Sequence, residues 1–508
     1  MTRPDQAVDH PDAPGQWHRL SPWMIAVKPI EQLPQLIPLL IAIVFAGRGA
    51  PDLAIIIGIV VVALVSVVPW LVTRYQVTDE HVRVRSGVLT RKVATARRDR
   101  IRSVDLTASP AHRIVGLTKV RIGTGGDKES SVVELNAIPT AEANLLHGNL
   151  MATATRITAR DAEPEDAPVE MTPPQELARL QRSWLRYSPF SLTGFAAAAA
   201  IGGLAAQVAN EADLYERGAS VVSDVGDRLQ GVPVALLVVV TVVAVLAIGV
   251  ALSVGGYLFS YWNFTLTRNL DDGTLRIRRG LLTTNATSLD ENRIRGVHTH
   301  EPVLMRPLRG ARLYAIATGH DKHPLLLPPA PASEVVRVGR LVAHDDFGGG
   351  VGDELTMPLR RHGPGAWSRR ITRGLWAGVI VAAVAAVLVA GPLTWPWLVL
   401  GILIAATSTM LGVVRYNHLG VGLTERSVVI SPPRIARHRY VVDRARTVGW
   451  ASRASFFQRR RGVETLSLAT AAGSESYAMV DLEPAASTGV MRAVSPDLVA
   501  PFLERNPE

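Results

Sequence analysis

Long apolar runs alternate along the chain with mixed segments that carry nearly all of its charge. The runs are rich in Val, Ile, Leu and Ala, and they fall into three pairs. A helix of about 20 apolar residues is long enough to cross the roughly 30 Å hydrocarbon core of a bilayer. The pattern therefore predicts six transmembrane helices in three hairpins, over residues 33–46 and 53–72, 190–208 and 232–259, and 371–390 and 395–414.

Charge in the short loops predicts the orientation. The loop 207–232 carries five acidic residues and two arginines, and the loop of the third hairpin is uncharged. Because positive charge is retained on the cytoplasmic side, we expect a multi-pass protein of the cell membrane. Its N-terminus, its C-terminus and its large intervening segments are expected to be cytoplasmic.

The mixed segments repeat one pattern three times. Each opens with a hairpin of alternating strands, as in HVRVR from His81, and then contains Arg-x-Arg-x-Val, beginning at Arg100, Arg293 and Arg444. A basic stretch that ends in glycine, a second alternating strand and an apolar closing stretch with proline follow in the same order. This regularity predicts an internal repeat of a small β-rich unit that ends in a helix.

These patterns divide the chain into nine segments. An N-terminal cytoplasmic or interfacial segment covers 1–32, and within it residues 17–30 mix aromatic, basic and apolar side chains, as is typical of a membrane interface. The remaining segments are transmembrane hairpins at 33–73, 186–260 and 369–414, β-rich domains at 74–156, 261–345 and 415–508, and mobile linkers at 157–185 and 346–368.

The blocks RIRSV and RIVGLTKVRIGTGG, which follow a pair of apolar runs, resemble the bacterial PH-like membrane-flanked domain. Three tandem copies resemble the YdbT-type membrane proteins. The resemblance implies a pleckstrin-homology-like fold in each copy, which is a bent antiparallel sheet with a C-terminal helix. It also implies a smaller membrane protein of the same family as a partner, and a role in envelope stress or antimicrobial peptide tolerance. It transfers no catalytic residue.

Composition and motifs point away from catalysis. Cysteine is absent, which excludes disulfides, thiolate metal sites and cysteine nucleophiles. No Walker A, GxSxG, HExxH or GxGxxG motif is present, so we predict no enzyme and no cofactor. The histidines of VHTHE, from Val297, lack a convergent third ligand, and GHDKH, from Gly319, is interpreted as a polar turn, so no metal site is expected.

The formal net charge of +10 narrows the choice of partner. Arginines cluster in the repeats, where they either maintain the membrane orientation or contact anionic lipid headgroups. Nucleic acid is not expected, because no aromatic stacking platform accompanies the charge. The candidate contacts with lipid or partner are the arginines of the repeated element, Arg100, Arg102, Arg293, Arg295, Arg444 and Arg446.

Each arginine pair projects from one face if its backbone is extended, since side chains two residues apart point the same way. Ile101 and Val104 cannot both face one core under strict alternation, so a turn or bulge at the strand entry is required.

Two functions remain open. One is a non-enzymatic membrane-anchored scaffold, whose PH-like domains contact anionic lipid or a partner membrane protein. The other is a subunit of a multi-protein export or lipid-handling complex. The predicted spans carry no acidic, lysine or histidine side chain near their centres, which argues against a conducting path through one chain.

Overall fold

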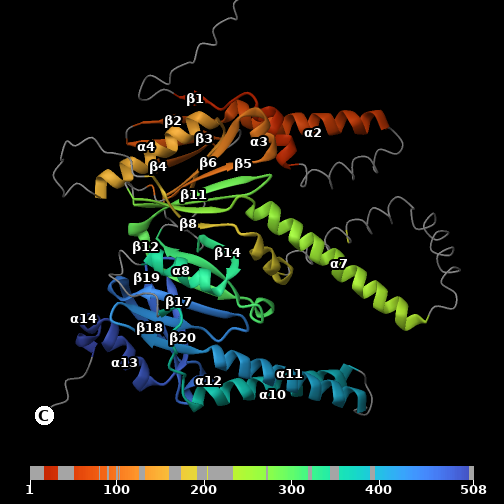
Figure 1. Ribbon diagram of the computed structural model, residues 1–508, viewed down its shortest axis with the longest axis vertical. Helices are drawn as coiled ribbons and strands as arrows, with labels where there is room; N and C mark the ends of the chain where they lie inside the picture. Colours follow the sequence, from red (N-terminus) through yellow and green to blue (C-terminus); the bar gives the residue numbers. More distant parts are fainter. Residues whose placement is uncertain are drawn as a thin grey trace, which may run out of the picture. The chain divides into compact units, whose positions relative to one another are not determined.

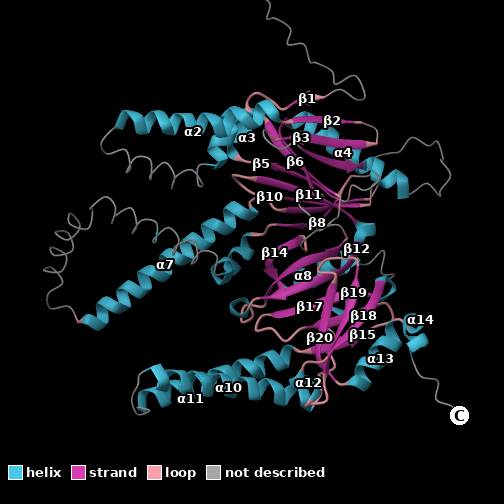
Figure 2. Cartoon of the chain, turned by 180° about the vertical axis from the view of Figure 1, so that it is seen from behind, coloured by secondary structure: helices cyan, strands magenta, loops and turns pink. Residues whose placement is uncertain are grey.

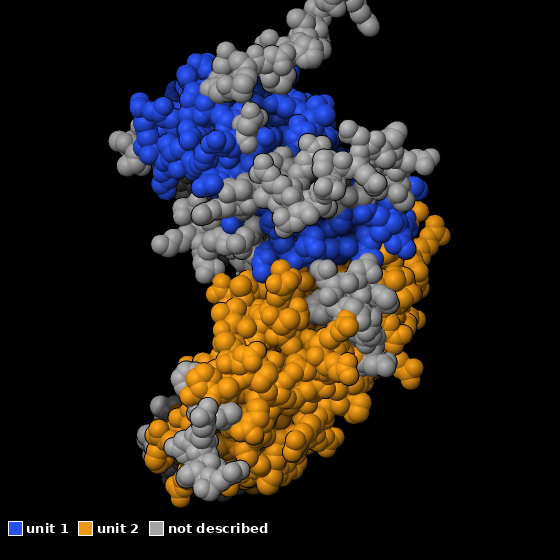
Figure 3. All heavy atoms as spheres, turned by 90° about the vertical axis from the view of Figure 1, so that its left-hand side faces the viewer, with its two compact units in different colours: residues 1–176, 267–293, 318–321 blue, residues 177–266, 294–317, 322–508 orange. Residues whose placement is uncertain are grey.

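The computed structural model describes residues 17–32, 51–78, 80–87, 91–98, 101, 103–124, 132–158, 173–191, 203, 233–270, 273–318, 323–343, 354–388 and 395–502. The described chain forms two compact units (Figure 3). Unit 1 comprises Met1–Glu176, Thr267–Arg293 and Thr318–Asp321, and unit 2 comprises Leu177–Leu266, Ile294–Ala317 and Lys322–Glu508.

The first repeat lies in unit 1 and consists of two antiparallel three-stranded meanders followed by a helix (Figure 1). Alternation explains the strands, because Val82 and Val84 in the first meander and Val120 and Ile122 in the second are buried. The elements are β2 (Arg74–Val77), β3 (His81–Ser86), β4 (Lys92–Arg97), β5 (Ser103–Ala108), α3 (Pro110–Val115), β6 (Leu117–Gly123), β7 (Val132–Pro139) and α4 (Thr140–Thr158).

The segment before the first apolar run contributes to the same core. β1 (His18–Arg19) pairs with β2, and residues 24–32 are helical. Leu20, Met24 and Val27 join the core of the first repeat. Part of the segment predicted to lie at a membrane interface is thus packed into the domain.

The second and third repeats follow the same order. The second contains β9 (Thr265–Asn269), β10 (Thr274–Arg279), β11 (Thr284–Asp290), η4 (Glu291–Arg293), β12 (Ile294–Glu301), η5 (Val303–Met305), β13 (Gly310–Ala317), β14 (Leu325–Pro331) and α8 (Ala332–Ala343). The third contains β15 (Gly420–Leu423), β16 (Ser427–Ser431), β17 (Arg437–Asp443), η6 (Arg444–Arg446), β18 (Thr447–Arg453), α12 (Phe456–Arg459), β19 (Glu464–Thr470), β20 (Ser476–Leu482) and α13 (Pro484–Val494), before α14 (Pro496–Val499) and η7 (Ala500–Phe502).

Neighbouring repeats share sheets. The strand orders are β1-β2-β3-β4, β7-β6-β5-β11-β10-β9-β8, β14-β13-β12-β17-β16-β15 and β18-β19-β20, where β8 is Gln175–Arg179. In unit 1, β5 of the first repeat pairs antiparallel with β11 of the second. In unit 2, β12 of the second repeat pairs antiparallel with β17 of the third. Two of the four sheets are therefore built from two successive repeats each.

The long helices precede the repeats along the chain (Figure 1). They are α2 (Pro51–Val72), α7 (Val234–Tyr261), α10 (Pro364–Leu388) and α11 (Trp395–His418), and η3 (Arg182–Ser191) lies ahead of α7.

The prediction of six transmembrane helices in three hairpins is wrong as a fold class. The repeats are built mainly of β-sheet, and in the described residues two helical stretches, Val238–Tyr261 and Val399–His418, are long and apolar enough to cross a membrane by length and composition alone. The predicted span 33–46 and most of 190–208 lie outside the described residues.

Charge near the start of α10 shortens one of the predicted spans. Arg369, Arg370 and Arg373 lie within the first ten residues of α10, so the uncharged part of the described helix, up to Leu388, extends about 22 Å at the usual helical rise. This described part alone is shorter than the roughly 30 Å of a bilayer core.

The helices α10 and α11 pack closely side by side (Figure 2). A Cβ atom added to Gly378 would lie 2.4 Å from Cβ of Ala405, and one added to Gly374 would lie 2.7 Å from Cα of Thr409. Gly374 and Gly378 are spaced as in a GxxxG motif, which allows two helix backbones to approach. These glycines therefore make the close packing of the hairpin possible.

Candidate functional site

An arginine-rich pocket lies in unit 2, where the hairpin of α10 and α11 meets the third repeat. It has a volume of about 510 Å³, and its lining includes four arginines and one carboxylate. Arg369, Arg370 and Arg373 come from the start of α10. Arg415 comes from the last turn of α11, and Asp481 from β20. We call this cavity the arginine pocket.

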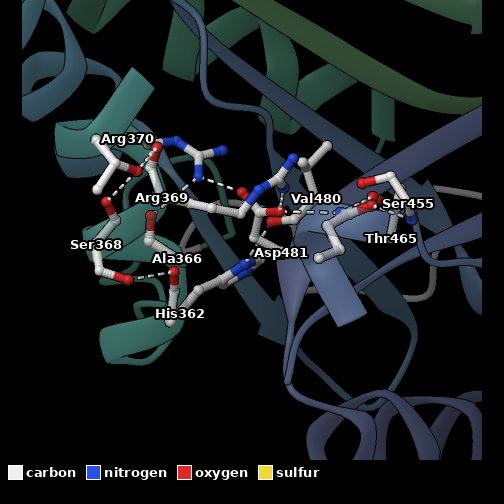
Figure 4. A network of polar contacts seen from close by, with 12 residues as sticks. His362, Ala366, Ser368, Arg369, Arg370, Ser455, Thr465, Val480 and Asp481 are labelled. Carbon is white, nitrogen blue, oxygen red and sulfur yellow. Dashed lines mark hydrogen bonds and ion pairs between the residues drawn. The ribbon is translucent and has the colours of Figure 1, made fainter. Parts of the chain in front are cut away.

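The carboxylate of Asp481 organises one side of the arginine pocket (Figure 4). Asp481 is 2% exposed, and its two oxygens accept hydrogen bonds from the guanidinium groups of Arg369 and Arg370. The side-chain amide of Gln458 donates a further hydrogen bond to Oδ1 at 2.9 Å. Burial lowers the pKa of Arg370, and its contact with Asp481 opposes that effect. The ion pair therefore compensates for the burial of the Arg370 guanidinium.

The backbone of β20 directs Asp481 toward α10. The register between β19 and β20 shifts between Glu464 and Thr465, and Asp481 has φ of 61°. Aspartate is among the few non-glycine residues enriched in this left-handed region. A bulge turns a side chain out of the regular alternation, so this irregularity gives the carboxylate its position.

Hydrogen bonds on both helices connect the hairpin to the sheet. Nδ1 of His362, just before α10, lies 2.9 Å from the carbonyl oxygen of Val480 (Figure 4). The hydroxyl of Tyr416 in α11 donates to the carbonyl of His362 at 2.6 Å. His362 is 3% exposed, and burial lowers its pKa. These contacts hold the ends of both helices against β20.

The other two arginines give the arginine pocket its charge. Arg373 and Arg415 are exposed, and among the described residues no carboxylate pairs with either. Asp481 offsets one of the four guanidinium charges, which leaves a surplus of positive charge around the cavity. Guanidinium groups bind phosphate and carboxylate oxygens through paired hydrogen bonds. The arginine pocket is therefore suited to an anion.

The predicted arginines of the repeated element lie elsewhere. Arg100 and Arg102 fall outside the described residues. The guanidinium of Arg293 donates to the carbonyl of Ile101 at 3.0 Å and lies 3.2 Å from Asp290. The guanidinium of Arg444 donates to the carbonyls of Thr424, Glu425 and Ala493. Both arginine side chains therefore stabilise the backbone around them through hydrogen bonds.

The second arginine of each described pair differs from the first. Arg295 is half-buried in β12, whereas the side chain of Arg446 is 56% exposed and lies 4.0 Å from Asp443. Arg293 ends the turn η4, and Arg444 and Arg446 both lie in η6, so neither pair sits on one strand. The turn that the spacing of Ile101 and Val104 required is thus present in the second and third repeats. Lipid contact by these arginines stays a prediction.

Histidines that are separate in the sequence come together at the junction of β12 and β17. Nε2 of His298 lies 3.0 Å from Nδ1 of His438, and the rings of His300 and His438 stack at 4.4 Å. Burial lowers the pKa of His438 to about 3 and that of His300 to about 4. Among the described residues, no group of three or more acidic or histidine side chains is placed to hold a metal ion.

Comparison with protein families identifies the repeat. The model of the family described as "Bacterial PH domain" matches residues 32–153, 227–344 and 377–492, which together make up most of the chain. The chain belongs to this family. Each match covers one set of strands and its closing helix, so the protein is a tandem array of three bacterial PH domains. No curated protein and no solved structure matches the chain.

Membership in the bacterial PH domain family indicates binding rather than a particular catalytic activity. Domains of this kind are binding modules, which suggests a scaffold that binds lipid or protein. The arginine pocket agrees with binding, because it offers paired donors and a cavity.

Sequence reasoning did not find the arginine pocket, because its parts are about 110 residues apart. Arg369, Arg370 and Arg373 form the only basic cluster in an otherwise apolar run of α10, and this was the available signal. Asp481 stands alone in the apolar closing strand. The sequence alone could not show that the buried Asp481 lies against the basic start of α10.

Proposed function

We propose that this protein is a membrane-anchored binding protein, and that its arginine pocket takes the headgroup of an anionic phospholipid. The proposal rests on the positions of Arg373 and Arg415. Arg415 lies three residues before the end of the candidate membrane-crossing stretch Val399–His418, and Arg373 lines the same pocket. If α11 crosses the bilayer, the pocket lies at headgroup depth.

Electrostatics favour an anionic headgroup over a neutral one. Basic groups near an anionic leaflet contribute about 1 kcal/mol each to binding. Two arginines that pair with no described carboxylate therefore give an expected preference of about 2 kcal/mol, or about 30-fold in affinity, for an anionic over a zwitterionic lipid. Arg369 and Arg370 contribute less, because Asp481 already neutralises part of their charge.

Membrane anchoring is part of the proposal. The exposed apolar side chains of Val238–Tyr261, including Val243, Val245 and Ile248, support insertion of α7 into a bilayer. Those of Ile402, Leu403 and Met410 support insertion of α11, with α10 packed along it. A bilayer cannot pass between paired strands, so β5 and β11 share one side of the membrane, and so do β12 and β17. We propose that this side is the cytoplasm.

Reporter fusions test the orientation. A reporter fused after Thr172 or after Glu508 should be active only in the cytoplasm, and one fused after Thr394, between α10 and α11, only outside it. Activity outside the cytoplasm at Thr172 or Glu508 would contradict the cytoplasmic placement.

Lipid-dependent stability tests the lipid proposal. The full-length protein in detergent is titrated with phosphatidylglycerol and, separately, with phosphatidylcholine while the unfolding temperature is recorded. A ligand at 100 times its dissociation constant stabilises the folded state by about 2.7 kcal/mol. We expect phosphatidylglycerol to raise the unfolding temperature and phosphatidylcholine to raise it much less, whereas equal shifts would contradict a pocket selective for anions.

A contribution to an envelope stress response or peptide tolerance rests on the resemblance to YdbT-type proteins, as does a smaller partner of the same family. Both remain part of this proposal. Loss of peptide tolerance on deletion of the coding sequence, restored by the wild-type chain, would support the first. Copurification of a smaller family member from native membranes would support the second.

A further inference from the structure

The two junctions between repeats share one arrangement. At each junction the first strand of a repeat's second meander pairs antiparallel with the last strand of the next repeat's first meander. These pairs are β5 with β11 and β12 with β17. Side chains reinforce the first junction, where Thr107 donates to Asn285 at 3.1 Å and Nε2 of His147 lies 3.0 Å from Ser288.

This arrangement leaves two strands at sheet edges. β4 is the counterpart of β11 and β17, and β18 is the counterpart of β5 and β12. In the described part of the chain, β4 pairs with β3 and ends its sheet, and β18 pairs with β19 and ends its sheet. Among the described strands, β4 and β18 therefore lack the partner from a neighbouring repeat that their counterparts have.

Exposure distinguishes β18 from its counterparts. The valines that end the repeated element are 0% exposed at Val104 and Val297, whereas Val448 is 66% exposed in the bulge at the start of β18. Val93 in β4 is 56% exposed. Proteins usually block open edges with charges or proline, yet β18 is uncharged and free of proline from Thr447 to Ser452. This edge has the character of an interface rather than of a protected surface.

We propose that β18 of one chain pairs antiparallel with β4 of a second copy of the same chain, as β5 pairs with β11 within it. A second copy is the occupant because it supplies the strand type that both internal junctions use. The contact is head-to-tail, so repetition gives a ring or an open array of repeats. This inference is independent of lipid binding.

The first junction also predicts the register. Thr107 lies opposite Asn285, which is the fifth residue after Gly280. Lys92 is the fifth residue after Gly87, and the two glycines share left-handed backbones with φ of 109° and 110°. Ala451 follows Arg444 by seven residues, as Thr107 follows Arg100. Ala451 of one copy should therefore lie opposite Lys92 of the next.

Cysteine cross-linking tests this register in the full chain, because the protein has no cysteine of its own. Two differently tagged full-length chains, one with Ala451→Cys and one with Lys92→Cys, are produced in the same cells and oxidised. Residues directly opposite across an antiparallel pair lie within reach of a disulfide. We expect a dimer that carries both tags, at least tenfold more abundant than with Ser476→Cys on β20 as the control partner of Lys92→Cys.

Other outcomes overturn the proposal. A predominant Ala451→Cys homodimer would show a symmetric contact instead of a head-to-tail one. Equal yields with the Ser476→Cys control would show random collision. A third measurement uses no cysteine: the mass of the solubilised wild-type chain should increase with concentration, and Ala451→Pro should suppress the increase. A monomer at every concentration, together with no cross-link, would rule out the pairing.

Discussion

The first and third repeats place different side chains at the bulge of their closing strands. Ala137 in β7 and Asp481 in β20 both have φ near 60°, and both lie next to a register shift. Ala137 is buried in an apolar core, whereas Asp481 pairs with two arginines of the adjoining helix. The same backbone irregularity thus serves packing in one repeat and a charged site in the other. In the third repeat, the side chain at the bulge and the start of α10 together form the charged site.

The largest effect should come from removing the charge of Asp481. Asp481→Asn leaves Arg369 and Arg370 buried without a counter-charge, and loss of one partner of a buried ion pair costs about 3–5 kcal/mol. At about 2–4 °C per kcal/mol, the unfolding temperature should fall by about 10 °C. Asp497→Asn, an exposed acid in α14, is the control and should have almost no effect. An unfolding temperature equal to that of the wild type would show that the ion pair of Asp481 does not stabilise the third repeat.

A smaller effect should come from separating α10 and α11. Gly378→Leu places carbon atoms where Ala405 already lies, and overpacking of this kind costs about 1–3 kcal/mol. Gly255→Leu in α7 is the matched control, since a Cβ atom there meets nothing within 4 Å. Comparison of the two unfolding temperatures in detergent checks the prediction. Equal shifts would show that α10 and α11 are not closely packed at Gly378.

Acid should weaken the junction of β12 and β17 through its histidines. The pKa of His438 in the folded protein is about 3, below the value of about 6.5 for an unfolded chain. The unfolded chain therefore binds the proton more readily, so this stabilisation is present above pH 6.5 and is lost as the pH falls toward 3. The unfolding temperature should fall by several degrees between pH 7 and pH 4, and less steeply in His438→Gln. Parallel curves for both proteins would contradict this role.

Local sequence pattern revealed the repeats but not the site or the sheets. Alternating residues such as Val82 and Val84 and the recurring Arg-x-Arg-x-Val made the strands and their threefold repetition predictable. The same method predicted six membrane helices, whereas the described residues contain two stretches that are long and apolar enough to cross a membrane, because an apolar run alone does not establish a complete span. The pairing of Asp481 with α10, and that of β12 with β17, depend on long-range geometry that no local pattern encodes.

Lipid binding to the arginine pocket can be measured directly by native mass spectrometry of the full-length protein. The protein is released from detergent with equal amounts of phosphatidylglycerol and phosphatidylcholine, and bound copies are compared between the wild type and the double variant Arg373→Gln/Arg415→Gln. Arg459→Gln/Arg461→Gln removes the same charge from exposed residues outside the arginine pocket and is the control. We predict a loss of about 30-fold in phosphatidylglycerol affinity for the pocket variant and wild-type binding for the control, from about 1 kcal/mol for each arginine. Equal phosphatidylglycerol binding by the wild type and the pocket variant would contradict the assignment of the arginine pocket as a headgroup site.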